Sequence, residues 1–388
     1  MTTPPLPVPP CPPLPPTFDI AREFPIVNRW AFFNHAGVAP IAARAAEALR
    51  QFAQQAQDDA YLGGRWYKQA EITRRNAARL INADPTEIAF VKNTSEGLAF
   101  VANGLTWSPG DQIISTAVEY PSNVYPWMDL AQRSGVQHIM VPERDARIDP
   151  AEIFAAVTPR TRMIALSHVE YASGFRHDLA AVGRFCRDHG ILLCVDGIQA
   201  CGMMPVDVQA MNIDFLSADG HKWMLGPEGA GIFYCNRRHL LTLRPEVGWM
   251  NVINADDYGN YDFTLRADAK RFECGSYNIP GVLALGAALQ LLLDVGIDTV
   301  WSRIESLTSQ LAAGLAAKGY QVFSSRRPGE TSGIVTFTSA VHKHAEIVHN
   351  LEAQKIIIVL REGRLRASPH FYNSHAQIEQ LVQALPGH

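Results

Sequence analysis

Two stretches decide the fold of this chain: Val-Asp-Gly-Ile-Gln-Ala at residues 195–200 and Phe-Leu-Ser-Ala-Asp-Gly-His-Lys-Trp at residues 215–223. One apolar run ends in Asp196, with Gln199 close behind it, and a second apolar run leads to His221 and Lys222. Short runs that are apolar on both faces are typical of strands in a sheet that helices cover on both sides. We therefore expect these polar groups at the carboxyl ends of strands, where α/β proteins bind ligands.

The same pattern extends outward over most of the chain. Apolar runs predict strands at 88–91, 112–116, 137–141, 163–167, 191–195, 215–217 and 231–234, and helices are predicted at 42–55, 66–81 and 96–104. This alternation predicts an α/β fold with a mostly parallel sheet between helices. Other polar groups follow strands in the same way, namely Asn93–Ser95, Glu119–Tyr120 and His168.

The pattern of predicted helices and strands changes after about residue 295. Helices are predicted at 300–318, 343–353 and 374–385, and strands at 321–324, 333–337, 356–359 and 364–367. Nine prolines fall within residues 3–16, which excludes a helix or a central strand there. The predicted organisation is a disordered Pro-rich tail (1–20), a large domain (21–295) and a smaller C-terminal α+β domain (296–388).

Composition limits the classes of function. The chain has 388 residues, of which 47% are hydrophobic and 19% charged, with a net charge of −4. This balance argues against nucleic acid or an anionic membrane as the main partner. The six cysteines form no C-x-x-C pair and predict free thiols in a reducing compartment. The apolar stretch 281–293 is too short to span a bilayer, and no signal peptide is recognisable, so a cytoplasmic protein is expected.

The order of Asp196, Gln199 and Lys222 suits chemistry on pyridoxal 5′-phosphate (PLP). A lysine forms a Schiff base with the cofactor aldehyde, and a carboxylate keeps the pyridine nitrogen protonated so that the ring accepts electrons. Gln199 could donate to the cofactor's phenolate oxygen. The alternatives are a helix-capping Asp and solvated Gln and Lys side chains.

Three further segments have a functional and an ordinary interpretation. One segment is expected to begin a helix: Asn93-Thr94-Ser95-Glu96-Gly97. Its functional interpretation is a binding site for a phosphate, and its ordinary interpretation is a capping box. Tyr120 has the functional interpretation of an aromatic ring that stacks on a flat cofactor, and the ordinary interpretation of a Tyr packed at a Pro turn. Arg366 grips a substrate carboxylate or makes a surface ion pair. The chain has no H-E-x-x-H zinc motif, so no metal site is predicted, and no Walker A, G-x-S-x-G or G-x-G-x-x-G motif.

Taken together, these motifs resemble the class V aminotransferase family of PLP enzymes of fold type I, over roughly residues 30–385. This family includes cysteine desulfurases, kynureninases, isopenicillin N epimerase-like proteins and C–S lyases. The matching pieces are Phe-Asn-His-Ala-Gly (33–37), Asn-Thr-Ser-Glu-Gly (93–97), Glu-Tyr-Pro-Ser-Asn (119–123), Ser-His-Val (167–169), Asp-Gly-Ile-Gln (196–199), Asp-Gly-His-Lys (219–222), Arg-Phe-Glu-Cys-Gly-Ser (271–276) and Arg-Ala-Ser (366–368).

The resemblance implies a role for each candidate. Lys222 would carry the cofactor and move the Cα proton, with Asp196 and His221 as further catalytic groups. The cofactor would be bound by Thr94, Ser95, Tyr120, Asp196, Gln199, Asp219, His221, Lys222, Trp249 and Ser276, with Ser276 reaching the phosphate of the neighbouring subunit in a homodimer. Arg366, Asn34 and His35 would bind a small amino-acid-like substrate.

Departures from the family pattern guide the predicted reaction. No Cys follows Cys274, whereas desulfurases need a persulfide-forming Cys before the position of Arg366, so the prediction is that this chain is not a persulfide cysteine desulfurase. Tyr171 and Asp219 also replace residues that desulfurases favour. We expect a PLP enzyme acting through a Lys222 aldimine and a quinonoid, with lyase chemistry (β-elimination, C–S type) or epimerase chemistry. The alternatives are a class V aminotransferase and a catalytically silent scaffold.

Overall fold

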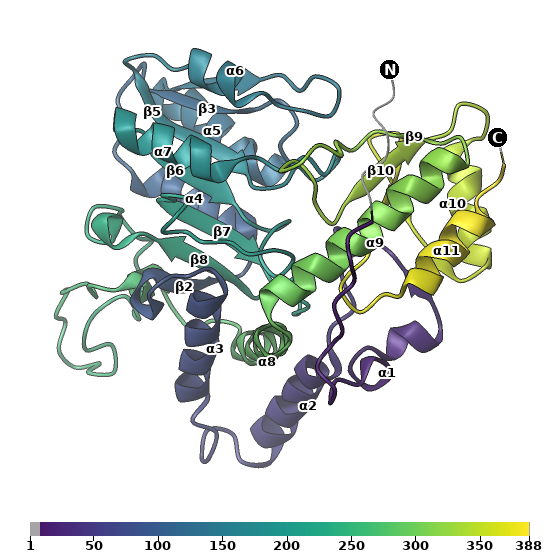
Figure 1. Cartoon of the computed structure of the whole chain (residues 1–388). Coiled ribbons are helices and arrows are strands. Elements are labelled where there is room, and N and C mark those ends of the chain that lie inside the picture. Colours follow the sequence, from purple (N-terminus) through teal and green to yellow (C-terminus); the bar gives the residue numbers. More distant parts are fainter. Residues whose placement is uncertain (1–7, 388) are drawn as a thin grey trace.

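A seven-stranded sheet forms the centre of the larger part of the protein. The computed structural model describes residues 8–387, and Figure 1 shows the sheet with helices on both faces. The strand order is β2-β8-β7-β6-β5-β3-β4. The strands are β2 (Ile88–Val91), β3 (Gln112–Thr116), β4 (Gln137–Val141), β5 (Thr161–Ser167), β6 (Leu192–Asp196), β7 (Phe215–Asp219) and β8 (Gly231–Cys235). β3 to β7 run parallel, and β8 runs antiparallel to its neighbours β7 and β2. The predicted α/β fold with a mostly parallel sheet between helices is confirmed.

Both faces of the sheet are buried, which explains the continuous apolar runs. Ile114 and Leu193 pack into one apolar cluster, while their chain neighbours Ile113 and Cys194 pack into the cluster on the opposite face. The helices of this part are α2 (Ala43–Asp58), α3 (Trp66–Leu80), α4 (Thr94–Gly104), α5 (Tyr125–Ser134), α6 (Pro150–Ala155), α7 (Leu179–His189) and α8 (Ile279–Val295).

The C-terminal part is built on the long helix α9 (Ile297–Ala317) and a four-stranded antiparallel sheet of order β12-β13-β10-β9 (Figure 1). Its strands are β9 (Gln321–Val322), β10 (Val335–Thr338), β12 (Val359–Arg361) and β13 (Arg364–Ala367), and its other helices are α10 (His344–Ala353) and α11 (His375–Ala384). The single strand predicted at 356–359 is instead divided, because Ile356–Ile357 forms β11 and pairs with β1 (Ala31–Phe32).

The pairing of β1 with β11 joins distant parts of the chain. Ala31 and Phe33 lie in the same apolar cluster as Leu307 and Leu365 of the C-terminal part. The segment around residue 31 therefore packs with the smaller unit, although it precedes the large sheet in sequence. The domain boundaries at 20 and 295 remain a proposal, with this segment crossing between the two units.

The Pro-rich segment differs from the predicted disordered tail over residues 8–20. Arg303 Nη1 donates to the Pro12 carbonyl at 2.6 Å, and Ser306 Oγ donates to the Pro9 carbonyl at 2.8 Å. Phe18 makes an edge-to-face contact with Phe371 at 5.8 Å between ring centroids. Proline-rich backbone keeps its carbonyl acceptors, and here side chains of α9 satisfy them. The short helix α1 (Ile20–Glu23) follows; residues 1–7 of the predicted tail lie outside the described residues.

A buried ion pair fixes the segment that precedes α8. Arg74 of α3 donates to both carboxylate oxygens of Glu273, at 2.7 and 3.1 Å, and Glu273 also accepts the Phe90 N–H of β2 at 2.9 Å. Both side chains are buried. A charge pair this desolvated needs such additional hydrogen bonds to be stable, and it holds residues 273–276 against the sheet.

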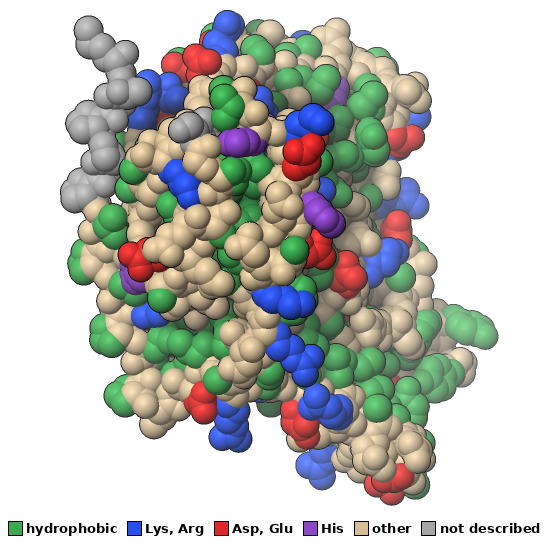
Figure 2. All heavy atoms as spheres, turned by 90° about the vertical axis from the view of Figure 1, so that its right-hand side faces the viewer, with side chains coloured by type: hydrophobic (Ala, Val, Ile, Leu, Met, Phe, Trp, Pro, Cys, Tyr) green, Lys and Arg blue, Asp and Glu red, His purple; other side chains and the backbone are tan. Residues whose placement is uncertain are grey.

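Two observations concern the surface and the long helices. On the face shown in Figure 2, positive and negative side chains are interspersed, without a broad patch of one charge. Within residues 8–387, no single helix is long and apolar enough to cross a membrane, although the bent pair α8 and α9, with 80° between them, meets those two criteria together.

Candidate active site

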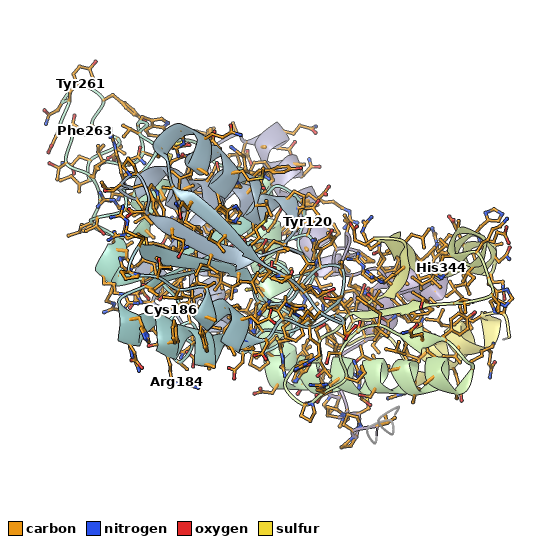
Figure 3. All side chains as sticks on the ribbon, turned by 90° about the horizontal axis from the view of Figure 1, so that it is seen from above. Tyr120, Arg184, Cys186, Tyr261, Phe263 and His344 are labelled. Atoms are coloured by element: carbon orange, nitrogen blue, oxygen red, sulfur yellow. The ribbon has the colours of Figure 1, made fainter. Side chains whose placement is uncertain are left out.

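A pocket of about 360 Å³ lies at the carboxyl edge of the large sheet, where the C-terminal part meets it. Among the predicted site residues, those that line it are Asn34, Thr94, Ser95, Tyr120, Asp196, Gln199, Asp219, His221, Lys222 and Arg366. Tyr120 is labelled in Figure 3, where it lies between the two parts of the molecule. The strand ends thus bring together residues that are far apart in sequence.

Asp196 and Lys222 are the central charged pair of the pocket. Asp196 is the last residue of β6, and Lys222 follows the end of β7, the neighbouring parallel strand. Burial raises the pKa of Asp196 to about 6, although the Ile198 N–H and the charge of Lys222 act in the opposite direction. Burial lowers the pKa of Lys222 to about 8, against the attraction of Asp196. The lysine amine therefore exchanges its proton near neutral pH.

The first turn of α4 opens into the same pocket. Asn93 is the N-cap, and its side chain accepts the Glu96 N–H at 3.0 Å. Thr94 Oγ1 accepts the Asp219 N–H at 3.0 Å, which leaves the Thr94 hydroxyl hydrogen able to donate, and Ser95 is exposed beside Ser122. The capping interpretation and the anion-site interpretation are thus compatible, because the free N–H groups of a helix start attract a phosphate.

Asp219 is held in a way that limits its repulsion of a phosphate. Its Oδ1 accepts the Gly220 N–H at 2.7 Å, and its Oδ2 lies 3.0 Å from His221 Nδ1. The contact with His221 lies within ion-pair distance but lacks hydrogen-bond geometry, because Nδ1 has no hydrogen-bond partner. Ring rotation or ligand binding would therefore allow His221 to place a donor toward an anion.

Gln199 and Tyr120 frame the space between Asp196 and the pocket mouth. Gln199 is buried; it accepts the Trp223 indole N–H at 2.8 Å and donates to the Ala36 carbonyl at 3.1 Å, so one amide hydrogen remains for a ligand. The Tyr120 ring is 45% exposed, and Lys222 Nζ lies 5.5 Å from its centroid. An open aromatic face beside the lysine suits a flat ring.

Arg366 is a buried cation that has no carboxylate partner among the described residues. Its Nη1 donates to the Tyr171 carbonyl at 2.7 Å and its Nη2 to Asn34 Oδ1 at 3.4 Å, while Nε is buried and makes no hydrogen bond. Burial, and then the charge of Arg361, lowers its pKa to about 9, so it remains a cation at neutral pH. A desolvated guanidinium of this kind is suited to receive a carboxylate.

The structure does not bring three of the predicted residues into this pocket. His35 is fully buried; its ring nitrogens bond to the Ser368 carbonyl at 2.8 Å and to the Tyr372 hydroxyl at 2.6 Å. Burial lowers the His35 pKa to about 3, so it is a neutral structural group rather than a substrate ligand. Ser276 lines a separate pocket, and Trp249 is half-exposed beside the same segment.

Other residues around the site were not predicted to bind substrate or cofactor. Tyr171, Arg361 and Glu228 line the pocket. Glu119, behind Tyr120, accepts the backbone N–H and the hydroxyl of Ser167 at 2.8 and 2.6 Å. For Glu119 a signal existed, since it follows a predicted strand and directly precedes Tyr120. For Arg361 no local signal distinguishes it from a surface arginine.

The residues present fit PLP. A buried acid, a half-buried lysine and an exposed aromatic ring meet beside a helix start, and a buried arginine has no anionic partner there. Asp196 would face the pyridine nitrogen, Thr94, Ser95 and His221 would hold the phosphate, and Lys222 would carry the cofactor. Among residues 8–387, no three His, Cys, Asp or Glu side chains are grouped to bind a metal ion.

We predict that Asp196→Asn stabilises the cofactor-free protein at pH 8. The folded-state pKa of Asp196 is raised from 3.8 to about 6, so ionising it costs stability, increasingly from pH 4 to 6 and fully above pH 6. Asparagine avoids a cost of up to about 3 kcal/mol, at ~1.4 kcal/mol per pKa unit. Urea unfolding of both proteins should give equal stability at pH 4 and a more stable variant at pH 8. A variant that is less stable at pH 8 would mean that the attraction of Lys222 outweighs burial.

Comparisons with known proteins identify the family of this chain. Residues 31–382 match the family model of the class V aminotransferases. A probable cysteine desulfurase of Methanothermobacter thermautotrophicus is 27% identical over 95% of this chain and 97% of its own length. Cysteine desulfurase CsdA of Escherichia coli is 30% identical over 81% and 82%.

Solved structures of an enzyme called C-DES are also similar. A C-DES mutant with glycine covalently linked to its PLP cofactor is 26% identical, covers 95% of this chain and 98% of its own, and has a TM-score of 0.88. The complex of the cystine C–S lyase C-DES with its product cysteine persulfide is 27% identical, covers 93% and 98%, and has a TM-score of 0.86.

These findings correct one prediction. The sequence led us to exclude a persulfide cysteine desulfurase and to prefer a β-eliminating lyase or an epimerase, but relatives over most of the chain are cysteine desulfurases. The lack of a Cys after Cys274 does not separate the chain from that group. The alternative that names the class V family is better supported than the lyase or epimerase interpretation. The chain belongs to the class V aminotransferase family and is a PLP-dependent enzyme of fold type I.

Proposed function

We propose that this enzyme removes sulfur from cysteine or a close analogue. In this reaction the carbon–sulfur bond breaks, the carbon takes up a proton to give alanine, and the sulfur passes to a thiol. The names of the relatives support the choice of cysteine. These relatives are called cysteine desulfurases, and this chain matches them over most of their length. The cystine C–S lyase C-DES, with its cysteine persulfide product, supports sulfur chemistry in this branch of the fold.

The observation that carries the proposal is the buried Arg366 beside Lys222. Arg366 makes no ion pair with an acid within residues 8–387, and its Nε is unsatisfied, so the α-carboxylate of an amino acid would supply the missing partner. PLP, when bound, draws electrons from the bonds at the substrate Cα. Lys222, with its pKa lowered to about 8 by burial, is suited to take and return a proton at Nζ.

The products of cysteine turnover test this function. With PLP, L-cysteine and a reducing thiol, the enzyme should release alanine and sulfide in equal amounts, and Lys222→Ala should release neither. Amino-acid analysis and a sulfide assay measure both products. Pyruvate and ammonia as the main products, or no reaction with cysteine, would contradict the proposal. Alkylation followed by peptide mapping during turnover identifies the thiol that carries the sulfur; Cys11 and Cys274 are the cysteines that are not buried.

We also propose that the enzyme is a homodimer with a shared active site. The loop between β8 and α8 extends from the body in Figure 3 and exposes large apolar side chains: Ile253 (46%), Tyr258 (73%), Tyr261 (99%) and Phe263 (64%). Ser276 and Cys274 are exposed next to this loop, on the segment that Glu273 fixes to the sheet. A second copy that covers these groups would bring Ser276 toward its phosphate site. All six cysteines are free, which supports a reducing, cytoplasmic location.

The shared site makes cofactor retention depend on dimerisation. We expect dilution to release PLP as dimers dissociate. Sedimentation experiments that monitor the absorbance of the cofactor measure both changes. Ser276→Ala should weaken PLP retention by about 1.5–3 kcal/mol, the contribution of a hydrogen bond to a charged group. Ser108→Ala, an exposed serine away from this segment, is the matched control. A monomer that keeps its full PLP content on dilution would exclude the shared site.

A further inference from the structure

The β12–β13 hairpin carries three arginines on one face. Its register pairs Arg361 with Arg364 and Val359 with Arg366. Because opposed residues share a face and side chains alternate along a strand, Arg361, Arg364 and Arg366 lie on the same side. Like charges this close on a small hairpin destabilise it. A cost of this kind is tolerated where the charges meet partners, so the partners of each arginine are informative.

Of the three arginines, only Arg364 does not line the active-site pocket. The Arg364 guanidinium lies 3.7 Å from the centroid of the Phe323 ring, and its charge acts on the half-buried Glu143. Arg361 and Arg366 both line the active-site pocket. Among residues 8–387, neither has a carboxylate oxygen within 4 Å. The exposed side chain of Arg361 makes no hydrogen bond there, whereas Arg366 donates only to the neutral acceptors Tyr171 and Asn34. The pocket thus holds two guanidinium groups that the chain leaves without an anion.

A tight turn and one hydrogen bond to the large unit position the exposed hairpin tip, which carries Arg361. The turn residues Glu362 and Gly363 both have positive φ, 46° and 71°, as in the tight turns that join twisted strands. Glu362 accepts the Tyr171 hydroxyl at 2.8 Å. The nearest acid in sequence is therefore bound to a tyrosine instead of to Arg361. The Tyr171 carbonyl in turn accepts Arg366 Nη1, so Tyr171 binds the hairpin at two residues, Glu362 and Arg366.

We propose that the pocket accepts amino acids with a negative charge on the side chain: Arg366 takes the α-carboxylate, and Arg361 takes the second anion. One guanidinium suffices for one carboxylate, so two unpaired guanidinium groups fit a substrate with two anions. Arg361 comes from the C-terminal sheet together with Arg366, not from the elements around the first turn of α4, where the phosphate would lie. The inference rests on the proposed function only in taking an amino acid to be the substrate.

Binding to the PLP-loaded enzyme tests this inference without turnover. Calorimetric titrations compare L-aspartate with L-asparagine and L-glutamate with L-glutamine, pairs that differ in charge and little in shape. We expect the acid of at least one pair to bind about tenfold more tightly than its amide, the effect of one charge-assisted contact at a partly exposed site. Arg361→Gln should abolish this preference by weakening the acid alone, and Arg361→Lys should keep most of it.

Arg364→Gln is the matched control, because Arg364 lies on the same hairpin face but outside the pocket. This variant should keep the preference of the natural enzyme. Equal affinity within both pairs, or a preference that survives Arg361→Gln, would overturn the inference. The outcome is independent of the cysteine assay: an enzyme that makes no alanine from cysteine can still prefer acidic ligands, and an active desulfurase can lack that preference.

Discussion

The structure depends on placing a carboxylate and an amine in one desolvated pocket. Asp196 and Lys222 each lose hydration, and burial shifts the pKa of both toward the neutral form, while the charge of each opposes the shift of the other. β6 pairs with β7 so that Asp196 lies opposite Ser217, five residues before Lys222. This register sets the positions of Asp196 and Lys222 relative to each other. Glu273 and Arg74 provide a second buried pair that fixes the segment before α8. The Arg74–Glu273 pair costs desolvation energy and is stable only with its additional hydrogen bonds to the Ile88 carbonyl and the Phe90 N–H.

Much of the fold and of the site could be predicted from local pattern. Lys222, Asp196, Thr94 and Tyr120 follow short apolar runs, and parallel strands bring such positions to one edge, so their meeting follows from topology. His35 could not be assigned this way, because its role depends on Tyr372 and Ser368, more than three hundred residues away in sequence. The contacts of Pro9 and Pro12 with α9 depend on similar long-range packing. The exclusion of desulfurases was wrong because the lack of one Cys was given more weight than the rest of the chain.

The side of the pocket where we propose that substrate binds combines residues from both units. Tyr171, from the loop after β5, binds Arg366 through its carbonyl and Glu362 through its hydroxyl. Burial raises the pKa of Tyr171 to about 12, so this hydroxyl remains a donor at neutral pH. The position of the β12–β13 hairpin relative to the large sheet is thus set at the pocket itself.

The central claim is that Lys222 carries the cofactor in a site completed by Asp196. The most direct measurement is borohydride reduction of the PLP-loaded enzyme, followed by proteolysis and mass spectrometry of the labelled peptide. The account predicts a single modified residue, Lys222, and a visible absorption band that disappears on reduction. Labelling of another lysine, or a protein that takes up no PLP, would contradict it.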